Sequence, residues 1–210
     1  MKPPRSIPSL PFRWGDFVFG NPGKCFPACI CMCSKYWTHY EPDLEIPLEL
    51  NDLERELGDS FYSASGLSLE RLKRQLRKTQ IKELNGERFN IGLTIEARCP
   101  KNLEDLYPFF LEDPPIPLIF VFDQNFTERN RLGDPHAVIL HHLDYETEKI
   151  YVIDPVKKDL KGTYPYDFNR FKLGWAKILN LTLAVAPLDR FIIMDGKEVR
   201  VYRQLKLTEV

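Results

Sequence analysis

The spacing of hydrophobic residues changes near the middle of the chain. Residues 25–37 (CFPACICMCSKYW) are apolar on nearly every side, which is typical of a buried helix. Residues 47–57 and 67–79 carry apolar residues at helical spacing, a strand is expected near 89–96 and a short helix near 101–111. The second half contains short β-rich segments separated by turn residues: 117–123, 136–144, 149–155, 178–187, 190–195 and 197–203.

Helices first and strands later predict an α+β fold, in which a buried helix packs on a mostly antiparallel sheet. The 210 residues fit a single domain. Within it we expect an N-terminal arm at 1–23, a helical part at 24–112 and an antiparallel sheet part at 113–210.

The buried helix begins at a cysteine. Proline is tolerated only in the first helical turn, so Pro27 puts Cys25 at or next to the N-cap. Unpaired backbone N–H groups and the positive end of the helix dipole favour a thiolate there, and Lys24 acts in the same direction. Taken alone, Cys25 is equally well interpreted as a structural cysteine, so a partner is needed.

The partner that the sequence offers is His136, which opens a strand after the turn 133–135. The next strand carries Asp154 just before Pro155. If a three-residue loop at 145–147 joins the two strands, the residue numbers of two positions paired across the hairpin add up to about 292. That register puts Asp154 opposite Val138, diagonal to His136 and on its face. A carboxylate in that place can accept a hydrogen bond from one imidazole nitrogen and leave the other for the cysteine.

These segments resemble a known family. The stretch KCFPACICMCSKYW is similar to the segment that opens the central helix of bacteriocin-processing, double-glycine leader peptidases and their stand-alone relatives, within the papain-like cysteine peptidase superfamily. HAVILHHLDYETEKIYVIDP resembles the family's histidine strand, turn and Asp-Pro strand, and GTYPYDFNRFKLGWAKILNLTLAVAP resembles its ending. The resemblance implies a papain-like fold, with Cys25 as nucleophile, His136 as general base and acid, and Asp154 orienting the imidazole.

Two positions differ from the family pattern. Phe19 stands where the family usually has a glutamine that holds the oxyanion, and Phe26 stands where it has a glycine. Asn21 carries the same amide on a shorter side chain, so we expect it to serve as one oxyanion donor, with the backbone N–H of Cys25 as the other.

Other histidines and tryptophans have plainer interpretations. In the predicted register His142 shares a face with His136, and we interpret it as a structural residue rather than a partner of the site. Trp175 is interpreted as a packing residue, and the alternative is that it shields the His136–Asp154 pair from water.

Composition narrows the class of partner. The 30 acidic and 29 basic residues nearly cancel and form no block, which argues against nucleic acid or an anionic membrane. We find no signal-peptide pattern and no membrane span, so a cytoplasmic location is expected. Five cysteines in a reducing compartment predict free thiols. Their spacing lacks paired zinc knuckles, so neither a metal nor a cofactor is expected.

The sequence therefore predicts a cysteine peptidase or amidase that acts on a peptide-like substrate through an acyl-enzyme. Two alternatives stay open: an acyltransferase with the same triad, and a catalytically disabled module that binds peptides. The substrate's identity and the oligomeric state do not follow from the sequence.

Overall fold

A computed structural model describes residues 6–7, 9–11, 18, 23–43, 50, 62–63, 66–67, 93–157, 163–187 and 190. Its helices are α1 (Cys25–Thr38), the 3₁₀ helix η4 (Leu103–Leu106), α4 (Tyr107–Leu111), α5 (Gln124–Arg129) and α6 (Phe168–Lys177). Its strands are β1 (Ser6–Ile7), β2 (Tyr62–Ser63), β3 (Gly66–Leu67), β4 (Thr94–Arg98), β5 (Leu118–Asp123), β6 (Pro135–Asp144), β7 (Lys149–Ile153), β8 (Tyr164–Asp167) and β9 (Thr182–Ala186).

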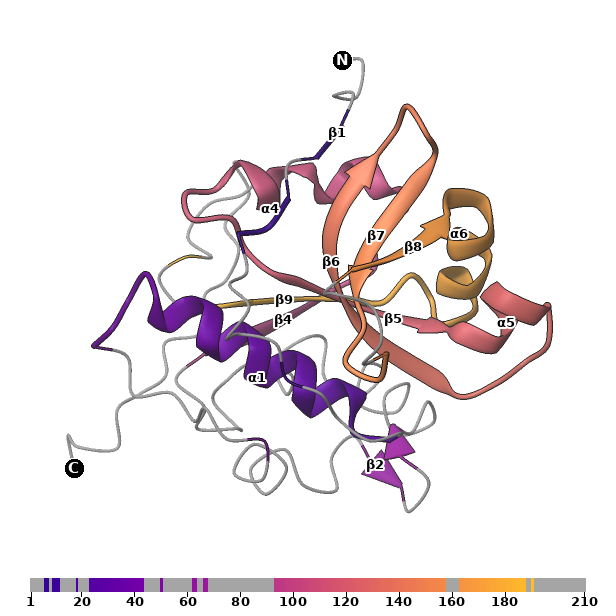
Figure 1. Cartoon of the computed structure of the whole chain (residues 1–210), viewed down its shortest axis with the longest axis horizontal. Helices are drawn as coiled ribbons and strands as arrows, with labels where there is room; N and C mark the ends of the chain where they lie inside the picture. Colours follow the sequence, from indigo (N-terminus) through magenta and orange to yellow (C-terminus); the bar gives the residue numbers. More distant parts are fainter. Residues whose placement is uncertain are drawn as a thin grey trace.

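The strands form one main antiparallel sheet with the order β4-β9-β5-β6-β7-β8, and β1 pairs with the far end of β6. Helix α1 packs against β6 and β9, whereas α6 packs against β5 and β8 and is joined there by α5 (Figure 1). This arrangement confirms the predicted α+β fold with a mostly antiparallel sheet. Strand β4 lies near the strand expected at 89–96, and two helices that were not expected, α5 and α6, lie among the strands of the second part.

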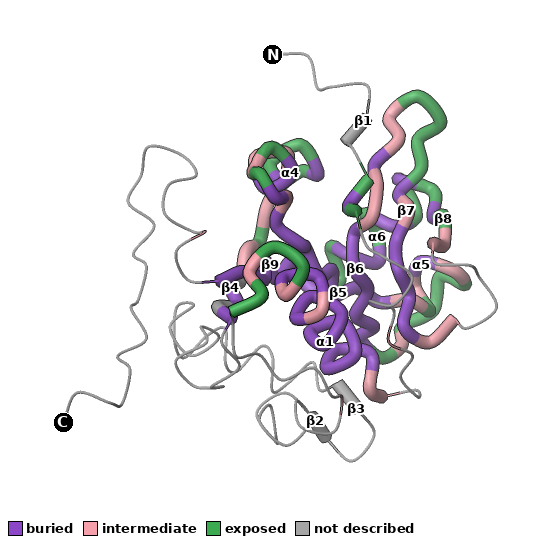
Figure 2. Tube along the Cα trace, turned by 60° about the vertical axis from the view of Figure 1, so that its left-hand side comes forward, coloured by how far each residue is buried: buried purple, intermediate pink, exposed green. Residues whose placement is uncertain are grey.

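Helix α1 is buried along almost its whole length, as its apolar sequence predicts. Twelve of its 14 residues are buried, and the tube of α1 is accordingly almost entirely purple (Figure 2). Two side-chain hydrogen bonds fix its C-terminal half: Trp37 Nε1 donates to the carbonyl of Val185 at 2.8 Å, and Tyr36 OH donates to that of Pro115 at 2.7 Å. The helix that begins at Cys25 is therefore held firmly against the sheet.

The β6–β7 hairpin differs from the predicted one at its turn. Asp144 pairs with Lys149, so the loop has four residues, not three. The Asp144 carboxylate accepts hydrogen bonds from the backbone N–H groups of Glu146 and Thr147, and Glu148 adopts a left-handed conformation with φ 53°. These local bonds favour the longer turn.

A β-bulge at His141 compensates for the extra loop residue. The ladder pairs His142 with Tyr151 on one side of the bulge and Leu140 with Val152 on the other. Beyond the bulge the register is therefore the one predicted for His136 and Asp154. Because the bulge reverses the alternation, His142 lies on the opposite face from His136, and the expectation that they share a face is wrong. His142 instead stacks near Tyr151, with ring centroids 5.6 Å apart.

The described part of the arm lies along β6. Ser6 and Ile7 pair with Asp144 and Leu143, and the backbone N–H of Leu10 donates to the carbonyl of the bulge residue His141 at 3.0 Å. Leu10 is 1% exposed and joins the hydrophobic core. The arm thus covers the part of β6 that β5 does not reach.

The predicted strand at 197–203 lies outside the described residues. So do the helix at 47–57 apart from Leu50, which is helical, and the strand at 190–195 apart from Arg190, which is in a 3₁₀ turn. Most of the predicted helix at 67–79 also lies outside, although its first residue, Leu67, ends the short strand β3. The predicted strand at 178–187 is shorter, because residues 178–180 form a turn before β9. Among the described helices, none is long and apolar enough to cross a membrane.

Candidate active site

Cys25 is the first residue of α1, with Lys24 at the N-cap. The side chain of Lys24 makes no capping hydrogen bond, and the first turn of α1 contains no acidic residue. Within that turn no carboxylate therefore opposes the positive end of the helix dipole. Cys25 is 3% exposed, and its sulfur accepts a hydrogen bond from the backbone N–H of Ala137 at 3.4 Å. This contact joins the head of the helix to the beginning of β6.

His136 links the cysteine to an aspartate. Its Nε2 lies 2.9 Å from Oδ1 of Asp154, 18 residues further along the chain. Cys25 is among the groups that raise the pKa of the imidazole, and Ala137, the residue after His136, donates its backbone N–H to the Cys25 sulfur. Because Nε2 faces the carboxylate, Nδ1 is the nitrogen available to the sulfur. The structure thus brings together three of the four predicted site residues.

The Asp154 carboxylate is fixed by the turn that follows β7. Its Oδ1 also accepts a hydrogen bond from the backbone N–H of Val156 at 2.9 Å. The backbone carbonyl of Asp154 accepts a second hydrogen bond, from the backbone N–H of Lys157, at 3.2 Å. Burial raises the pKa of Asp154, but the hydrogen bond to His136, the charge of His136 and the Val156 amide outweigh burial and lower it. Asp154 is therefore a carboxylate at neutral pH.

The surroundings of His136 favour its protonated form. Burial alone would lower the pKa of His136, but the hydrogen bonds to Asp154 and Cys25, with the negative charges of both groups, raise it to about 9. An imidazolium between a carboxylate and a sulfur is the arrangement in which a thiolate–imidazolium pair forms. This site can therefore supply both a nucleophile and a proton donor.

The aromatic ring beside the imidazole is Phe122, whose centroid lies 5.9 Å from that of His136. Phe122 is opposite His136 in the β5–β6 ladder. Trp175 contacts Phe120 and Phe171, and its Nε1 donates to the carbonyl of Leu181. Trp175 thus packs in the α6 layer, and Phe122, not Trp175, is the described ring in contact with the imidazole.

The positions that differ from the family pattern are resolved only in part. Phe19 and Asn21 lie outside the described residues, so the oxyanion role expected of Asn21 stays a prediction. Phe26 is 1% exposed and belongs to the hydrophobic core. Its ring therefore contributes to the packing of α1.

The remaining thiols of α1 are buried in the core. Cys29, Cys31 and Cys33 are each at most 1% exposed. Burial is the main cause that raises the pKa of the Cys29 and Cys33 thiols, which keeps both neutral. The described part of the chain holds no group of three or more His, Cys, Asp or Glu side chains arranged to hold a metal ion.

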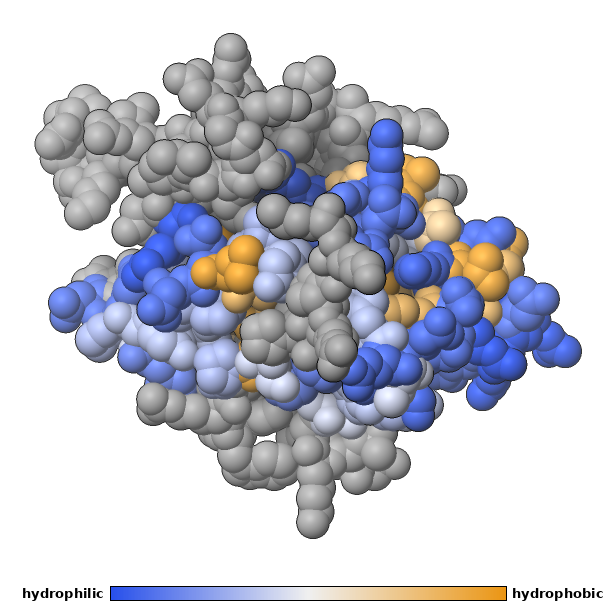
Figure 3. All heavy atoms as spheres, turned by 90° about the horizontal axis from the view of Figure 1, so that it is seen from above, coloured by the Kyte–Doolittle hydropathy of each residue, from blue (hydrophilic) through white to orange (hydrophobic). Residues whose placement is uncertain are grey.

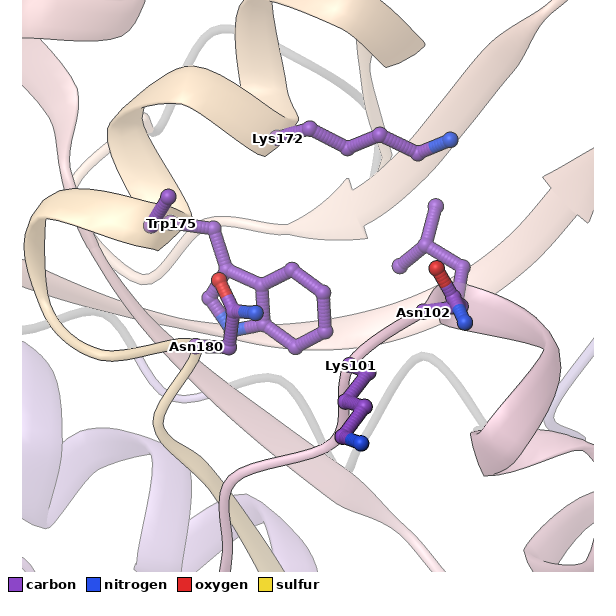
Figure 4. Close-up of a pocket in the computed structure, with 7 residues that line it drawn as sticks. Lys101, Asn102, Lys172, Trp175 and Asn180 are labelled. Atoms are coloured by element: carbon purple, nitrogen blue, oxygen red, sulfur yellow. The ribbon is translucent and has the colours of Figure 1, made fainter.

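A separate cavity of about 170 Å³ lies at the C-terminal end of α6 (Figure 4). Lys101, Asn102, Lys172, Trp175 and Asn180 line it, and none of the three site residues does. Asn180 is partly engaged, because its amide donates to the carbonyl of Pro100 at 3.0 Å. The cavity is therefore separate from the site at Cys25.

The described surface is mostly hydrophilic on the face shown in Figure 3, where hydrophobic residues form separate small areas. Large apolar side chains that are exposed in the described part of the chain include Leu111, Leu132, Leu173 and Leu179. Scattered exposed leucines are normal on a folded domain and do not define a partner.

A group of polar residues that lies near the site was not singled out from the sequence. Glu128 on α5 and Lys157 after β7 form an ion pair of 3.1 Å, and the hydroxyl of Tyr166 on β8 donates to the same Glu128 oxygen at 3.3 Å. Helix α5 itself was not predicted. The signal that could have found it is Asp123, which caps α5 by accepting a hydrogen bond from the N–H of Phe126.

The fold is that of the papain-like cysteine peptidases. Two solved structures are similar to it. One is a protein from Bacillus anthracis named a C39-like peptidase, with a TM-score of 0.54 and 14% identity over 87% of this chain and 98% of that one. The other is xylellain, a cysteine protease from Xylella fastidiosa, with a TM-score of 0.50 and 12% identity over 88% of this chain and 86% of that one.

At these identities the likeness extends to the fold alone. No protein-family model matches the sequence, and no curated protein matches it significantly. The chemistry of this chain must therefore be argued from its own residues.

Proposed function

We propose that this protein is a cysteine peptidase or amidase that hydrolyses a peptide-like substrate. The observation that carries the proposal is the position of His136, whose imidazole hydrogen-bonds Asp154 through Nε2 and whose chain neighbour, Ala137, donates its backbone N–H to the Cys25 sulfur. The fold shared with two proteins named as cysteine peptidases supports the same reaction class.

In the proposed reaction the Cys25 thiolate attacks the scissile carbonyl carbon, and the carbonyl π electrons move onto oxygen. The N–H of Cys25 and the amide of Asn21 hold this oxyanion. The His136 imidazolium then gives its proton to the leaving amine as the C–N bond breaks, which leaves a thioester at Cys25. Neutral His136 next takes a proton from water, the hydroxide attacks the thioester, and the thiol is released with the acid product.

Asp154 keeps the imidazole in the tautomer and orientation that this sequence of proton transfers needs. A carboxylate bonded to Nε2 stabilises the imidazolium and directs Nδ1 at the sulfur. Asp154 is well suited to this role because it is buried at 5% exposure and held by the amide of Val156.

A peptidyl vinyl sulfone tests the proposal. The reagent should form a covalent adduct on Cys25, found by mass spectrometry of the digested protein, and the adduct should disappear in Cys25→Ala and His136→Ala. The matched control is Cys99→Ala, which removes an exposed thiol and should leave the labelling unchanged. An adduct that persists without Cys25, or that lies on Cys99, would overturn the assignment.

Hydrolysis itself is tested by incubating the protein with a library of natural peptides. New peptide ends should accumulate with the wild type and not with Cys25→Ala. Adduct formation at Cys25 without any hydrolysis would instead favour an acyltransferase, because that enzyme keeps the nucleophile and changes only the acceptor.

A further inference from the structure

Behind the His136–Asp154 pair lies a cluster of four polar side chains, which we call the rear cluster: Gln124, Glu128, Lys157 and Tyr166. Its centre is Oε1 of Glu128, which accepts hydrogen bonds from Gln124 Nε2 at 2.9 Å, Lys157 Nζ at 3.1 Å and Tyr166 OH at 3.3 Å. The ammonium of Lys157 also lies 3.4 Å from the centre of the Tyr164 ring. The cation is thus held from two sides.

The rear cluster joins the two chain segments that carry the site. Glu128 is on α5, in the connection between β5 and β6, and β6 is the strand that carries His136. Lys157 is three residues after Asp154, and its backbone N–H donates to the Asp154 carbonyl at 3.2 Å. The Glu128–Lys157 ion pair therefore connects the segment before the histidine with the turn that holds the aspartate.

Two further observations connect the rear cluster to the site. Phe122 contacts both the Tyr166 ring at 5.5 Å and the His136 ring at 5.9 Å, so the cluster packs against the imidazole through one aromatic layer. Burial raises the pKa of Asp154. The interactions with His136, the Val156 amide and, last, the charge of Lys157 lower it. The pKa of Glu128 is lowered too, because hydrogen bonds from Gln124 and Lys157 outweigh its partial burial.

We propose that Glu128 and Lys157 are positioning residues, whose ion pair holds the Asp154 turn and thereby the His136 imidazole in the geometry that transfers a proton to and from the reacting atoms. This inference rests on the proposed function, since it assigns a role in that reaction. The side chain of Lys157 is 21% exposed and that of Glu128 is 29% exposed. Because ion pairs in contact with solvent stabilise a fold only weakly, this pair acts on the site by fixing geometry more than by a large ion-pair energy.

The test uses two small reagents that need no substrate recognition. Iodoacetamide alkylates the thiolate by forming a C–S bond as iodide leaves, and no proton is transferred. Ethyl vinyl sulfone forms a C–S bond at its β-carbon, and the α-carbon then takes a proton from the imidazolium. The ratio of the two rate constants at Cys25 therefore reports the placement of His136.

Lys157→Met keeps the length of the side chain and removes its charge. A misplacement of 1 Å can cost about 10²-fold in rate, so partial loosening should slow the vinyl sulfone reaction by about 5- to 20-fold. The iodoacetamide rate should change less than about twofold. Glu128→Gln should act in the same direction, and Lys157→Met/Glu128→Gln should be no slower than the slower single variant, because the two residues act as a unit.

Lys157→Arg should restore most of the vinyl sulfone rate, since a guanidinium can pair with Glu128. The matched control is Lys172→Met on α6, because Lys172 also holds its ammonium near an aromatic ring, 5.6 Å from Phe168. That control should leave both rates unchanged. Circular dichroism of every variant establishes that it is folded.

An imidazole titration separates positioning from simple loss of charge. Removing a nearby positive charge by itself would raise the pKa of His136, whereas loosening its bond to Asp154 would lower it from about 9. We expect a lower value in Lys157→Met by NMR. An equal or higher value together with an unchanged rate ratio would overturn the inference.

The two failures are distinguishable. A wild-type protein in which Cys25 reacts with vinyl sulfone no faster than in His136→Ala contradicts the proposed function. If the vinyl sulfone rate of the wild type depends on His136, but Lys157→Met and Glu128→Gln react as fast as the wild type, only the positioning role is contradicted.

Discussion

The imidazole of His136 and the carboxylate of Asp154 lie 2.9 Å apart because a bulge at His141 restores the register that the hairpin loop displaces. The four-residue loop shifts the ladder by one position, and the bulge shifts it back before His136 is reached. A one-residue slip would carry the carboxylate to the other face of the sheet. The alignment of this pair therefore depends on two local features that balance each other.

Asp154→Asn should change the pH dependence of the site. With Asp154 present, the pKa of His136 is raised to about 9, so the imidazolium is fully present below the ordinary value of 6.5 and is lost as the pH rises through about 9. Without the carboxylate, the hydrogen bond and the charge of Asp154 no longer raise that pKa, so it falls. The basic limb of the ethyl vinyl sulfone rate should thus move to lower pH in Asp154→Asn, and a limb that stays near pH 9 would contradict this explanation.

The cysteines should react in two classes. Cys25 and the exposed Cys99 should be carboxamidomethylated by iodoacetamide in the native protein at pH 7.5. Cys29 and Cys33 should react only after unfolding, because burial raises the pKa of both thiols and excludes the reagent. Peptide mapping after timed labelling measures each rate. Native labelling of Cys33 as fast as that of Cys25 would mean that α1 is not buried as described.

Gly174 should not tolerate alanine. A Cβ at this position would overlap Oγ1 of Thr127 and lie 2.6 Å from the backbone carbonyl oxygen of Asp123. Glycine to alanine in a helix normally stabilises by about 0.5–1 kcal/mol. Here we expect Gly174→Ala to lower the free energy of unfolding in urea by about 1–3 kcal/mol, because the α5–α6 contact is overpacked.

Thr127→Ala/Gly174→Ala provides the control for that clash. Removing the hydroxyl should recover only part of the lost stability, since the Asp123 carbonyl remains. A Gly174→Ala variant as stable as the wild type would show that α5 and α6 are not in contact there.

Asp123 should matter to both stability and reactivity. One carboxylate oxygen caps α5 through the N–H of Phe126 at 2.8 Å, and the other accepts from the N–H of Gly133 at 3.0 Å, just before His136. Asp123→Ala loses both bonds and should lower the free energy of unfolding by about 1–3 kcal/mol.

Asp123→Asn keeps one acceptor oxygen, so its loss of stability and of vinyl sulfone rate should fall between those of the wild type and Asp123→Ala. Equal stability of all three proteins in urea would show that the carboxylate does not hold this connection.

The parts of the fold that sequence predicted have strong local signals. The apolar run with Pro27 in its first turn defines α1, and the apolar β-rich segments define β5, β6 and β7. Strand β8 was missed because it contains Pro165. It tolerates the proline because β8 is the last strand in the sheet order, where one N–H edge needs no partner.

The two helices that were missed are short or polar on one side. Asp123 caps α5 and Asp167 caps α6 by accepting hydrogen bonds from the backbone N–H groups of Phe126 and Arg170. From the sequence, Asp123 was placed at the end of the strand 117–123, and no cap was assigned to Asp167. The bulge at His141 has no sequence signature, because it arises from the balance between the turn and the ladder. The rear cluster could not be foreseen either, since it depends on α5 and β8 being present.

The central claim is that the sulfur of Cys25 and the imidazole of His136 interact. An NMR titration of the His136 ring in the wild type and in Cys25→Ala measures this directly. We predict a pKa of about 9 in the wild type and a lower value in Cys25→Ala, because the hydrogen bond and the charge of Cys25 both raise it. Titration of His136 near 6.5 in both proteins would contradict the account.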